Sequence, residues 1–505
     1  MFDQFSKDAV VRPRIDFRLV SGILGGLIFC LGVSMLLPCL IALIYHEASW
    51  SAFLITAGGT MAAGGLLFYR YKPEHELRMR EAFLIVALIW FLGSLFSAFP
   101  FVLSGSLESY TDAVFEAMSG LTTTGATIFG GITASGIQNP DIESLDKSIL
   151  FWRSLSHWLG GMGIIVLTLA LLPLLGIGGM QLYQAEYSGS TADKITPRIQ
   201  ETALLLWTIY VGLTAGEFVL LWLHPSMDWF EAMNHAFATL ATGGFSTKNA
   251  SVAAFDSVYI DAVITLFMFL AGINFALHFR MFTGDPKPFF ENREFRFYVL
   301  LTAIFTVGIV GGLVITQDYS IGEALQYGTF QVVSIVTTTG FGTDDYMLWL
   351  PFSSFLLFLL FFTGGCAGST GGGIKMIRLM IIMKNISREF KQLIHPQAIL
   401  PIRLGNKVVE QKILKTILGF FVMYFIVFAA GAIIMTTMGF DMMSSMGASI
   451  ASLGNIGPGW GEFGPINNYA KIPIFGKWVL LILMMIGRLE LFTVLVLFTP
   501  WFWKN

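Results

Sequence analysis

Apolar stretches long enough to cross a membrane recur along this chain, with shorter stretches between some of them. A helix that spans the hydrocarbon core needs about 20 apolar residues. Four intervening stretches, at about 111–122, 228–240, 321–336 and 441–452, are too short to span. The pattern predicts ten spanning helices, at about 18–45, 50–70, 81–104, 149–175, 200–223, 257–281, 295–316, 351–383, 408–438 and 475–503.

Each short stretch runs into a string that contains glycine. N-cap side chains are expected at the starts of the short helices, from Asp112, Asp228, Ser320 and Asp441. The strings are Thr122-Thr123-Thr124-Gly125-Ala126, Ala241-Thr242-Gly243-Gly244-Phe245, Thr337-Thr338-Thr339-Gly340-Phe341 and Gly454-Asn455-Ile456-Gly457-Pro458. One such string alone would indicate only a turn or close helix packing, but four copies indicate an ion pore.

Glycine allows several backbone carbonyls to point in one direction, and carbonyl oxygens can replace the hydration shell of an ion. The residues expected to form this selectivity filter are Thr123, Thr124, Gly125, Thr242, Gly243, Thr338, Thr339, Gly340, Asn455, Ile456 and Gly457. Because the second and fourth strings diverge from the other two, we expect uneven carbonyl geometry and a moderately selective filter.

The predicted fold is an all-α polytopic membrane protein with two leading helices and four helix–pore loop–helix repeats in a pseudo-fourfold arrangement around one pore. The boundaries are 1–75 for the two leading helices, then 76–190, 191–290, 291–400 and 401–505 for the four repeats. The third repeat also contains a candidate gating loop.

Composition and charge agree with this architecture. Hydrophobic residues make up 55% of the chain, charged residues 12%, and the mean hydropathy is +0.71, so a soluble protein is excluded. A net charge of −3 gives no nucleic-acid-binding surface, and no histidine or cysteine has metal-ligand spacing. With both termini in the cytoplasm, 24 of the 30 basic residues fall on the cytoplasmic side and all four strings face outward. The expected outer loops are acidic, through Glu108, Asp112, Asp141, Glu143, Asp146, Asp344, Asp345 and Glu462.

Glycines crowd residues 363–373, inside the predicted helix at 351–383. Such a density opposes a helix, and irregular backbone at membrane depth is tolerated where it lines a cavity or is packed within protein. We expect an intramembrane gating loop here; close helix packing is the alternative. The gate residues would be Gly364, Gly365, Gly368, Ser369, Thr370, Gly371, Gly372 and Gly373, with Lys375 beside them. For Lys375 itself, snorkelling at the helix end is the favoured interpretation.

Arg488 lies inside the last predicted span, where a charge is functional by default. A salt bridge to Glu490 is the alternative, but residues two apart on a helix point to different faces. Glu217 and Asn274 also lie within spans and are expected to join polar packing networks.

Three segments together resemble the TrkH branch of the Trk/Ktr/HKT potassium-transporter superfamily. They are Phe151-Trp152-Arg153-Ser154-Leu155-Ser156-His157-Trp158-Leu159-Gly160-Gly161-Met162-Gly163, the run from Gly364 to Lys375, and Gly487-Arg488. The resemblance covers nearly the whole chain and places the family's filter glycines at Gly125, Gly243, Gly340 and Gly457. Four glycines favour potassium over sodium.

The resemblance implies potassium uptake in a bacterial inner membrane, gating by the 363–373 loop, and Arg488 facing the pore as an electrostatic barrier. It also implies a homodimer in membrane lipid and a cytoplasmic TrkA-type partner that binds nucleotide, so that the chain itself carries no covalent cofactor. Two alternatives remain open at this point. One is a sodium-permeable or ion-coupled (Na+/K+ or H+/K+) symporter of the same fold, and the other is a multi-spanning membrane enzyme.

Overall fold

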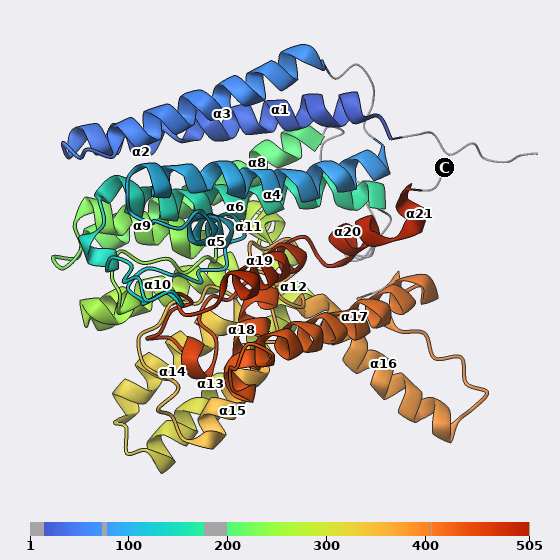
Figure 1. Ribbon diagram of the computed structural model, residues 1–505. Coiled ribbons are helices and arrows are strands. Elements are labelled where there is room, and N and C mark those ends of the chain that lie inside the picture. Colours follow the sequence, from blue (N-terminus) through green and yellow to red (C-terminus); the bar gives the residue numbers. More distant parts are fainter. Residues whose placement is uncertain (1–14, 73–77, 176–198, 406, 504–505) are drawn as a thin grey trace, which may run out of the picture.

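The structure, a computed structural model, describes residues 15–72, 78–175, 199–405 and 407–503. These residues form a bundle of helices (Figure 1), with one short hairpin of β1 (Arg403–Leu404) and β2 (Lys407–Val408). The predicted all-α membrane fold is confirmed in its class.

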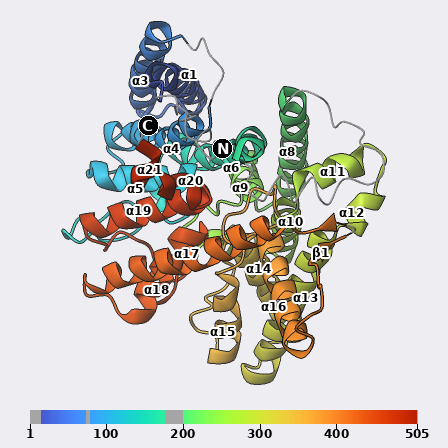
Figure 2. The same cartoon turned by 90° about the vertical axis from the view of Figure 1, so that its right-hand side faces the viewer.

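The leading helices are α1 (Phe17–Ser34), α2 (Leu36–Ile44) and α3 (Trp50–Arg70). Small residues bring α1 and α3 together, because a Cβ on Gly25 would lie 2.7 Å from the carbonyl oxygen of Gly64. Figures 1 and 2 both place this pair at one edge of the molecule and α13, α15 and α16 at the opposite edge.

The four repeats follow in chain order, each with a short helix between longer ones. The first has α4 (Met79–Leu103), α5 (Tyr110–Leu121), η1 (Ile142–Ser144) and α6 (Lys147–Leu175); the second has α8 (Ile199–Trp222), α9 (Trp229–Leu240), η2 (Ser251–Phe255), α10 (Val258–Ala271), α11 (Phe275–Phe282) and α12 (Lys287–Glu291). The third has α13 (Arg293–Thr316), α14 (Ile321–Val336), α15 (Pro351–Leu360) and α16 (Met376–Ile394); the fourth has α17 (Gln411–Thr436), α18 (Met442–Gly454), η3 (Gly461–Phe463), α19 (Ile474–Arg488), α20 (Phe492–Leu495), η4 (Val496–Phe498) and α21 (Pro500–Trp503).

Within the described residues, six helices are long and apolar enough to cross a membrane, or eight if each of two bent pairs counts as one span. The sequence predicted ten. The remaining two are α6, whose side chains beyond residue 163 lie outside the description, and the stretch at 351–383, which residues 361–375 divide into α15 and α16.

Two spans predicted to be continuous are sharply bent. The stretch at 257–281 turns by 101° between α10 and α11, where the Asn274 side chain accepts the N–H of Ala276 and starts a new helix. The stretch at 475–503 turns by 113° after Arg488, where Glu490 and Leu491 adopt left-handed φ angles of 58° and 44°. The expectation of unbroken helices was therefore wrong at both places.

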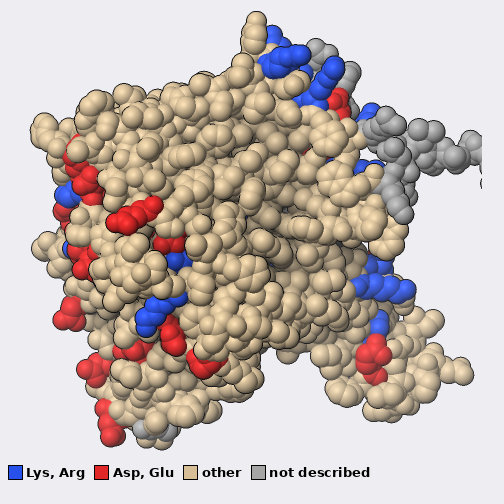
Figure 3. Space-filling view, in the orientation of Figure 1, with Lys and Arg blue, Asp and Glu red and all other residues tan. Residues whose placement is uncertain are grey.

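Charged side chains separate toward two ends of the molecule. Figure 3 shows acidic side chains gathered at the left end and mainly Lys and Arg at the right end. Asp112, expected in an acidic outer loop, is instead 3% exposed and forms a 2.6 Å ion pair with Lys477 of α19. Asp344 accepts hydrogen bonds from the Tyr319 hydroxyl and the Trp349 indole, and burial together with the Asp344 carboxylate raises the pKa of Tyr319 to about 12.

Candidate functional site

The four short helices α5, α9, α14 and α18 begin with capped N-termini. Side chains of Asp228, Ser320 and Asp441 accept backbone N–H groups of the first turn, as predicted. For α5 the cap is Ser109 rather than Asp112, which lies one turn further on. We call these four the pore helices; with 12 to 16 residues each, they are shorter than a span requires.

All four pore helices are followed by the same succession of backbone conformations. A residue with left-handed φ comes first, and a glycine with positive φ follows two residues later. The pairs are Thr123 (51°) and Gly125 (80°), Thr242 (53°) and Gly244 (80°), Thr338 (60°) and Gly340 (83°), and Asn455 (55°) and Gly457 (97°). A β-branched residue at positive φ is a genuine outlier, so the surrounding structure must hold these three threonines in place.

The second string differs from the sequence prediction by one residue. The glycine with positive φ is Gly244, and Gly243 takes the place that Thr124 and Thr339 occupy in other strings. The phenylalanine that follows Gly244 and Gly340 was a signal for this register, because both strings read Gly-Phe. The unevenness expected from the sequences is absent from these backbone angles.

The strings contact one another in a closed ring. A Cβ built on Gly125 would lie less than 3.0 Å from the Gly243 carbonyl oxygen. The same holds for Gly244 and Thr339, Gly340 and Ile456, and Gly457 and Thr124. Each string therefore packs its glycine against a carbonyl of the next, and the fourth returns to the first. Only glycine fits at these four positions.

The backbone N–H groups of the strings turn back toward the pore helices. In the first string the N–H of Thr124 donates to Ser119 (2.9 Å), and in the third that of Thr339 donates to Ser334 (2.8 Å); Gly243 and Ile456 make the equivalent bonds. Among the described residues, the carbonyl oxygens of Thr123, Thr124, Thr242, Gly243, Thr338, Thr339, Asn455 and Ile456 accept no hydrogen bond. These oxygens are suited to bind a cation.

Residues 361–375, which we call the glycine loop, connect α15 to α16 and lie against the ends of three pore helices. The Thr370 hydroxyl donates to the Leu240 carbonyl (3.0 Å), and the Gly372 N–H donates to the Thr338 hydroxyl (2.7 Å). A Cβ on Gly372 would lie 2.5 Å from the Gly454 carbonyl. The loop is therefore in direct contact with the third string.

The other predicted gate residues hold the glycine loop's irregular shape. Gly368 and Gly373 have left-handed φ angles of 77° and 62°. The Gly365 carbonyl accepts the N–H of Met376, and Gly364 packs against the Gly372 carbonyl. The Ser369 hydroxyl is buried and has no hydrogen-bond partner among the described residues.

Arg488, at the end of α19, joins the glycine loop to the first repeat. Its guanidinium donates to the carbonyls of Thr370 (2.6 Å) and Gly160 (3.1 Å), and the residue is 2% exposed. It is not paired with Glu490, whose carboxylate accepts from Arg378 of α16. Residues of the first, third and fourth repeats therefore meet at this one side chain.

Lys375 does not snorkel, contrary to the prediction. It is 8% exposed, and its ammonium donates to the Gly371 carbonyl within the glycine loop. The carboxyl ends of the pore helices carry partial negative charge and so favour a cation nearby. Lys375 and Arg488 place two positive charges close to those ends.

Of the other polar residues within predicted spans, Asn274, His157 and His278 bond within the protein, whereas Glu217 has no partner among the described residues. Asn274 caps α11, and the N–H of Phe275 beside it donates to the Gly368 carbonyl of the glycine loop. The His157 ring contacts the Gly120 carbonyl (2.9 Å) and the His278 ring the Leu270 carbonyl (2.9 Å), so both histidines bond within the protein. Glu217 is fully buried, and neither carboxylate oxygen has a hydrogen-bond partner among the described residues.

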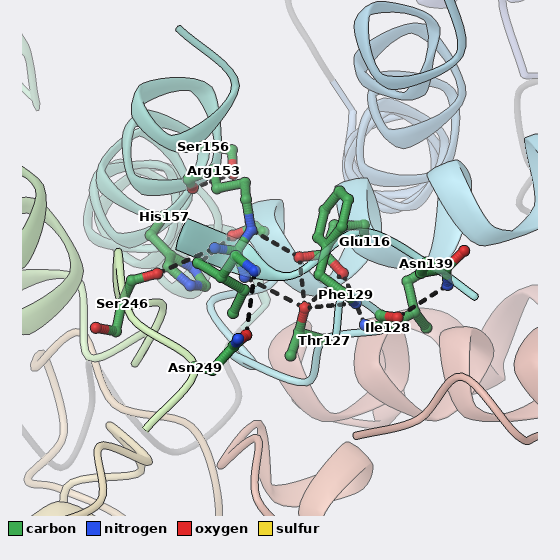
Figure 4. Close-up of polar contacts among 12 residues, drawn as sticks. Glu116, Thr127, Ile128, Phe129, Asn139, Arg153, Ser156, His157, Ser246 and Asn249 are labelled. Atoms are coloured by element: carbon green, nitrogen blue, oxygen red, sulfur yellow. Dashed lines mark hydrogen bonds and ion pairs between the residues drawn. The ribbon is translucent and has the colours of Figure 1, made fainter. Parts of the chain in front are cut away.

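Sequence reasoning missed a buried ion pair behind the first string. Arg153 and Glu116, which are 1% and 0% exposed in their side chains, lie 2.8 Å apart. Figure 4 shows the pair with Thr127 and Ser246 around it. A glutamate and an arginine at interior positions of two helices of the predicted membrane region were the available signal.

Comparisons with known proteins place this arrangement in a family. The model of the TrkH family, described as cation transport protein, matches residues 51–504. The Trk system potassium uptake protein TrkH of Escherichia coli K12 is 43% identical over 498 residues, which cover 97% of this chain and 100% of that protein. TrkG of the same organism is 34% identical, covering 97% and 99%. The crystal structure of the potassium transporter TrkH from Vibrio parahaemolyticus superposes with a TM-score of 0.88 at 38% identity, covering 97% of this chain and 100% of that one. This chain therefore belongs to the TrkH family of cation transport proteins.

Proposed function

We propose that this chain mediates potassium uptake through a pore formed by the ring of four strings. The observation that carries the proposal is the closed ring, in which the N–H groups bond to the pore helices and eight carbonyl oxygens accept no hydrogen bond among the described residues. A potassium ion that enters such a ring exchanges water oxygens for carbonyl oxygens. The relatives named as potassium uptake proteins support this choice of ion.

The same proposal assigns the gate to the glycine loop and Arg488. The loop touches the third string through Gly372 and Thr338, and Arg488 donates a hydrogen bond to Thr370 of the loop. The guanidinium bonds to Thr370 of the loop and to Gly160 of α6, which stabilises the loop's present position and adds a positive charge near the pathway. Opening then requires that the loop leave Arg488 or move together with it.

We further propose a bacterial inner membrane, both termini in the cytoplasm, a homodimer, and a TrkA-type nucleotide-binding partner on the basic face. The separation of charge in Figure 3 supports this orientation, because basic residues favour the cytoplasmic side. Since the family is one of transporters, the alternative of a membrane enzyme is wrong.

The test uses purified protein in potassium-loaded liposomes, with rubidium and sodium uptake measured at equal protein. Gly125→Ser should lower the preference for rubidium over sodium, because a side chain there meets the Gly243 carbonyl. Arg488→Ala should raise the uptake rate. An unchanged ion preference in the first variant would contradict the filter assignment, and an unchanged rate in the second would contradict the gate assignment.

A further inference from the structure

The pore helices carry an equivalent position that, in three of the four repeats, contacts the segment leaving the string. This position precedes the left-handed residue of each string by the same number of residues. It is Glu116 before Thr123, His235 before Thr242, Gln331 before Thr338 and Ala448 before Asn455. We call it the support position. Its residue type differs in every repeat.

Three of the four support positions bond to the segment beyond the string. Glu116 accepts hydrogen bonds from the Thr127 hydroxyl (3.0 Å) and the Ile128 N–H (3.1 Å). The His235 ring is 3.0 Å from the Ser246 hydroxyl, and Gln331 donates to the Asp344 carbonyl (3.2 Å). Ala448 has no polar group, so the fourth string has no bond of this kind.

Arg153 extends the first support to the second string. Besides Glu116, its guanidinium donates to the Thr127 hydroxyl (3.2 Å) and to the Ser246 carbonyl (3.1 Å). It also lies 4.2 Å from the centre of the Phe245 ring, and Phe245 follows Gly244 directly. Figure 4 shows that the side chain crosses from α6 to both segments. One buried cation therefore fixes the outer ends of two neighbouring strings.

We propose that Arg153 and Glu116 are a positioning pair that holds the first and second strings in register and thereby sets the preference for potassium over sodium. This inference rests on the proposed function. Thr123 and Thr242 have backbone conformations that persist only where the surroundings fix them. If the segments beyond them relax, the carbonyls can close around a smaller ion, so sodium gains relative to potassium.

A purely structural role is the competing explanation, and the chain contains a matched control for it. Asp112 lies one turn before Glu116 on α5 and forms the buried pair with Lys477. That pair joins α5 to α19, and within the described part of the chain it makes no hydrogen bond to a string or to a segment that leaves one. Both pairs bury an acid of the same helix, so loss of either should lower stability.

The experiment compares Glu116→Gln, Arg153→Gln, Arg153→Lys and Thr127→Val with the control Asp112→Asn. Each protein is reconstituted at equal amount, and the ratio of rubidium to sodium uptake is measured. Glu116→Gln gives the first repeat the residue that the third has at Gln331, which bonds in a folded string. We expect this ratio to fall about tenfold in Glu116→Gln and Arg153→Gln. It should fall less in Arg153→Lys, which keeps the charge, and in Thr127→Val, which removes one hydroxyl.

Asp112→Asn should lower thermal stability and leave the ratio unchanged. A wild-type ratio in folded Glu116→Gln and Thr127→Val would overturn the inference, even if Arg153→Gln did not fold. Equal falls in those variants and in Asp112→Asn would also overturn it. If Gly125→Ser changes the ratio while the support variants do not, only this inference fails; if none changes it, the filter assignment fails as well.

Discussion

The ring of strings depends on backbone conformation, whereas the glycine loop beneath it depends on particular side chains. The strings have unlike sequences, from Thr-Thr-Gly to Asn-Ile-Gly, yet their paired φ angles agree within a narrow range. The glycine loop, Lys375 and Arg488 each occur in one repeat only, and their contacts depend on particular side chains. Ligands supplied by the backbone need only a conformation, so a ring can be repeated without repeating its sequence. A gate that acts through side chains requires particular residues, so its sequence cannot vary in this way.

The sharpest test of the ring's dependence on backbone conformation compares Gly340→Ala with Gly342→Ala. At Gly340 a Cβ meets the Ile456 carbonyl at a φ of 83°, whereas at Gly342 the nearest atom is 3.7 Å away and the φ is not in the left-handed region. Strain at such a residue costs about 1–3 kcal/mol before any clash. Rubidium uptake should fall at least about tenfold in Gly340→Ala, since about 1.4 kcal/mol corresponds to that factor.

The control Gly342→Ala should retain near wild-type uptake. If both variants lost uptake equally, the ring would depend on glycine flexibility in general rather than on the four contacts between strings.

The gate's dependence on particular side chains is tested by comparing Arg488→Gln with Arg378→Gln. Arg488 bonds to two carbonyls, one of them in the glycine loop, whereas Arg378 is paired with Glu490. A hydrogen bond to a charged group contributes about 1.5–3 kcal/mol. Uptake should therefore rise about tenfold in Arg488→Gln, measured as the initial rubidium rate in liposomes.

Arg378→Gln should lower stability and leave this rate within about twofold of wild type. A rise of the same size in both variants would mean that loosening any arginine near α19 opens the pathway, and the specific role of Arg488 would be lost.

The sequence predicted what depends on local pattern, and it failed where distant partners decide. Apolar length and N-cap residues located the pore helices, and Asp228, Ser320 and Asp441 cap as expected. The break after Arg488 was not predictable, because Glu490 bonds to Arg378, more than one hundred residues away in sequence. Lys375 was misjudged for a related reason, since its partner is a carbonyl that only an irregular loop presents.

The position of the positive-φ glycine within the second string was another feature that the sequence prediction misplaced. Gly243 and Gly244 are equally permissive by type, so residue type alone could not assign the positive φ to Gly244; the phenylalanine that follows Gly244 was the available signal. The ion pair of Arg153 and Glu116 shows the same limit, because no spacing rule joins residues on α5 and α6.

A smaller effect should mark the contact between the two regions. The Thr338 hydroxyl accepts the N–H of Gly372, whereas the equivalent Thr123 hydroxyl is buried without a partner among the described residues. A hydrogen bond of this kind is worth about 1 kcal/mol, or about fivefold in an equilibrium. Thr338→Val should therefore change the uptake rate about fivefold at unchanged ion preference, and Thr123→Val should not. Equal effects would place the coupling in the threonine hydroxyls of the ring and not in the glycine loop.

The smallest effect is expected at the N-terminus of α18, the end of this pore helix that does not lead into a string. Asp441 accepts the N–H groups of Met443 (3.0 Å) and Ser444 (3.3 Å). Loss of such a cap costs about 1 kcal/mol. Asp441→Ala should therefore lower the thermal midpoint in detergent by a few degrees, while Asp441→Asn should lower it less and uptake in both should stay near wild type. A loss of uptake in either would mean that the ring depends on the far ends of its helices.

The cap also predicts a dependence on pH. Hydrogen bonds from Ser444, and from the backbone N–H groups at the helix start, hold the pKa of Asp441 below its usual range. A carboxyl with a lowered folded-state pKa stabilises the protein fully above its unfolded-state pKa of about 3.9, and the contribution is lost as the pH falls through the folded-state value. The wild-type protein should lose this increment of thermal stability on acidification, whereas Asp441→Asn should lack it. The same acid-dependent loss in Asp441→Asn would assign it to other carboxyls, since the asparagine cap does not titrate.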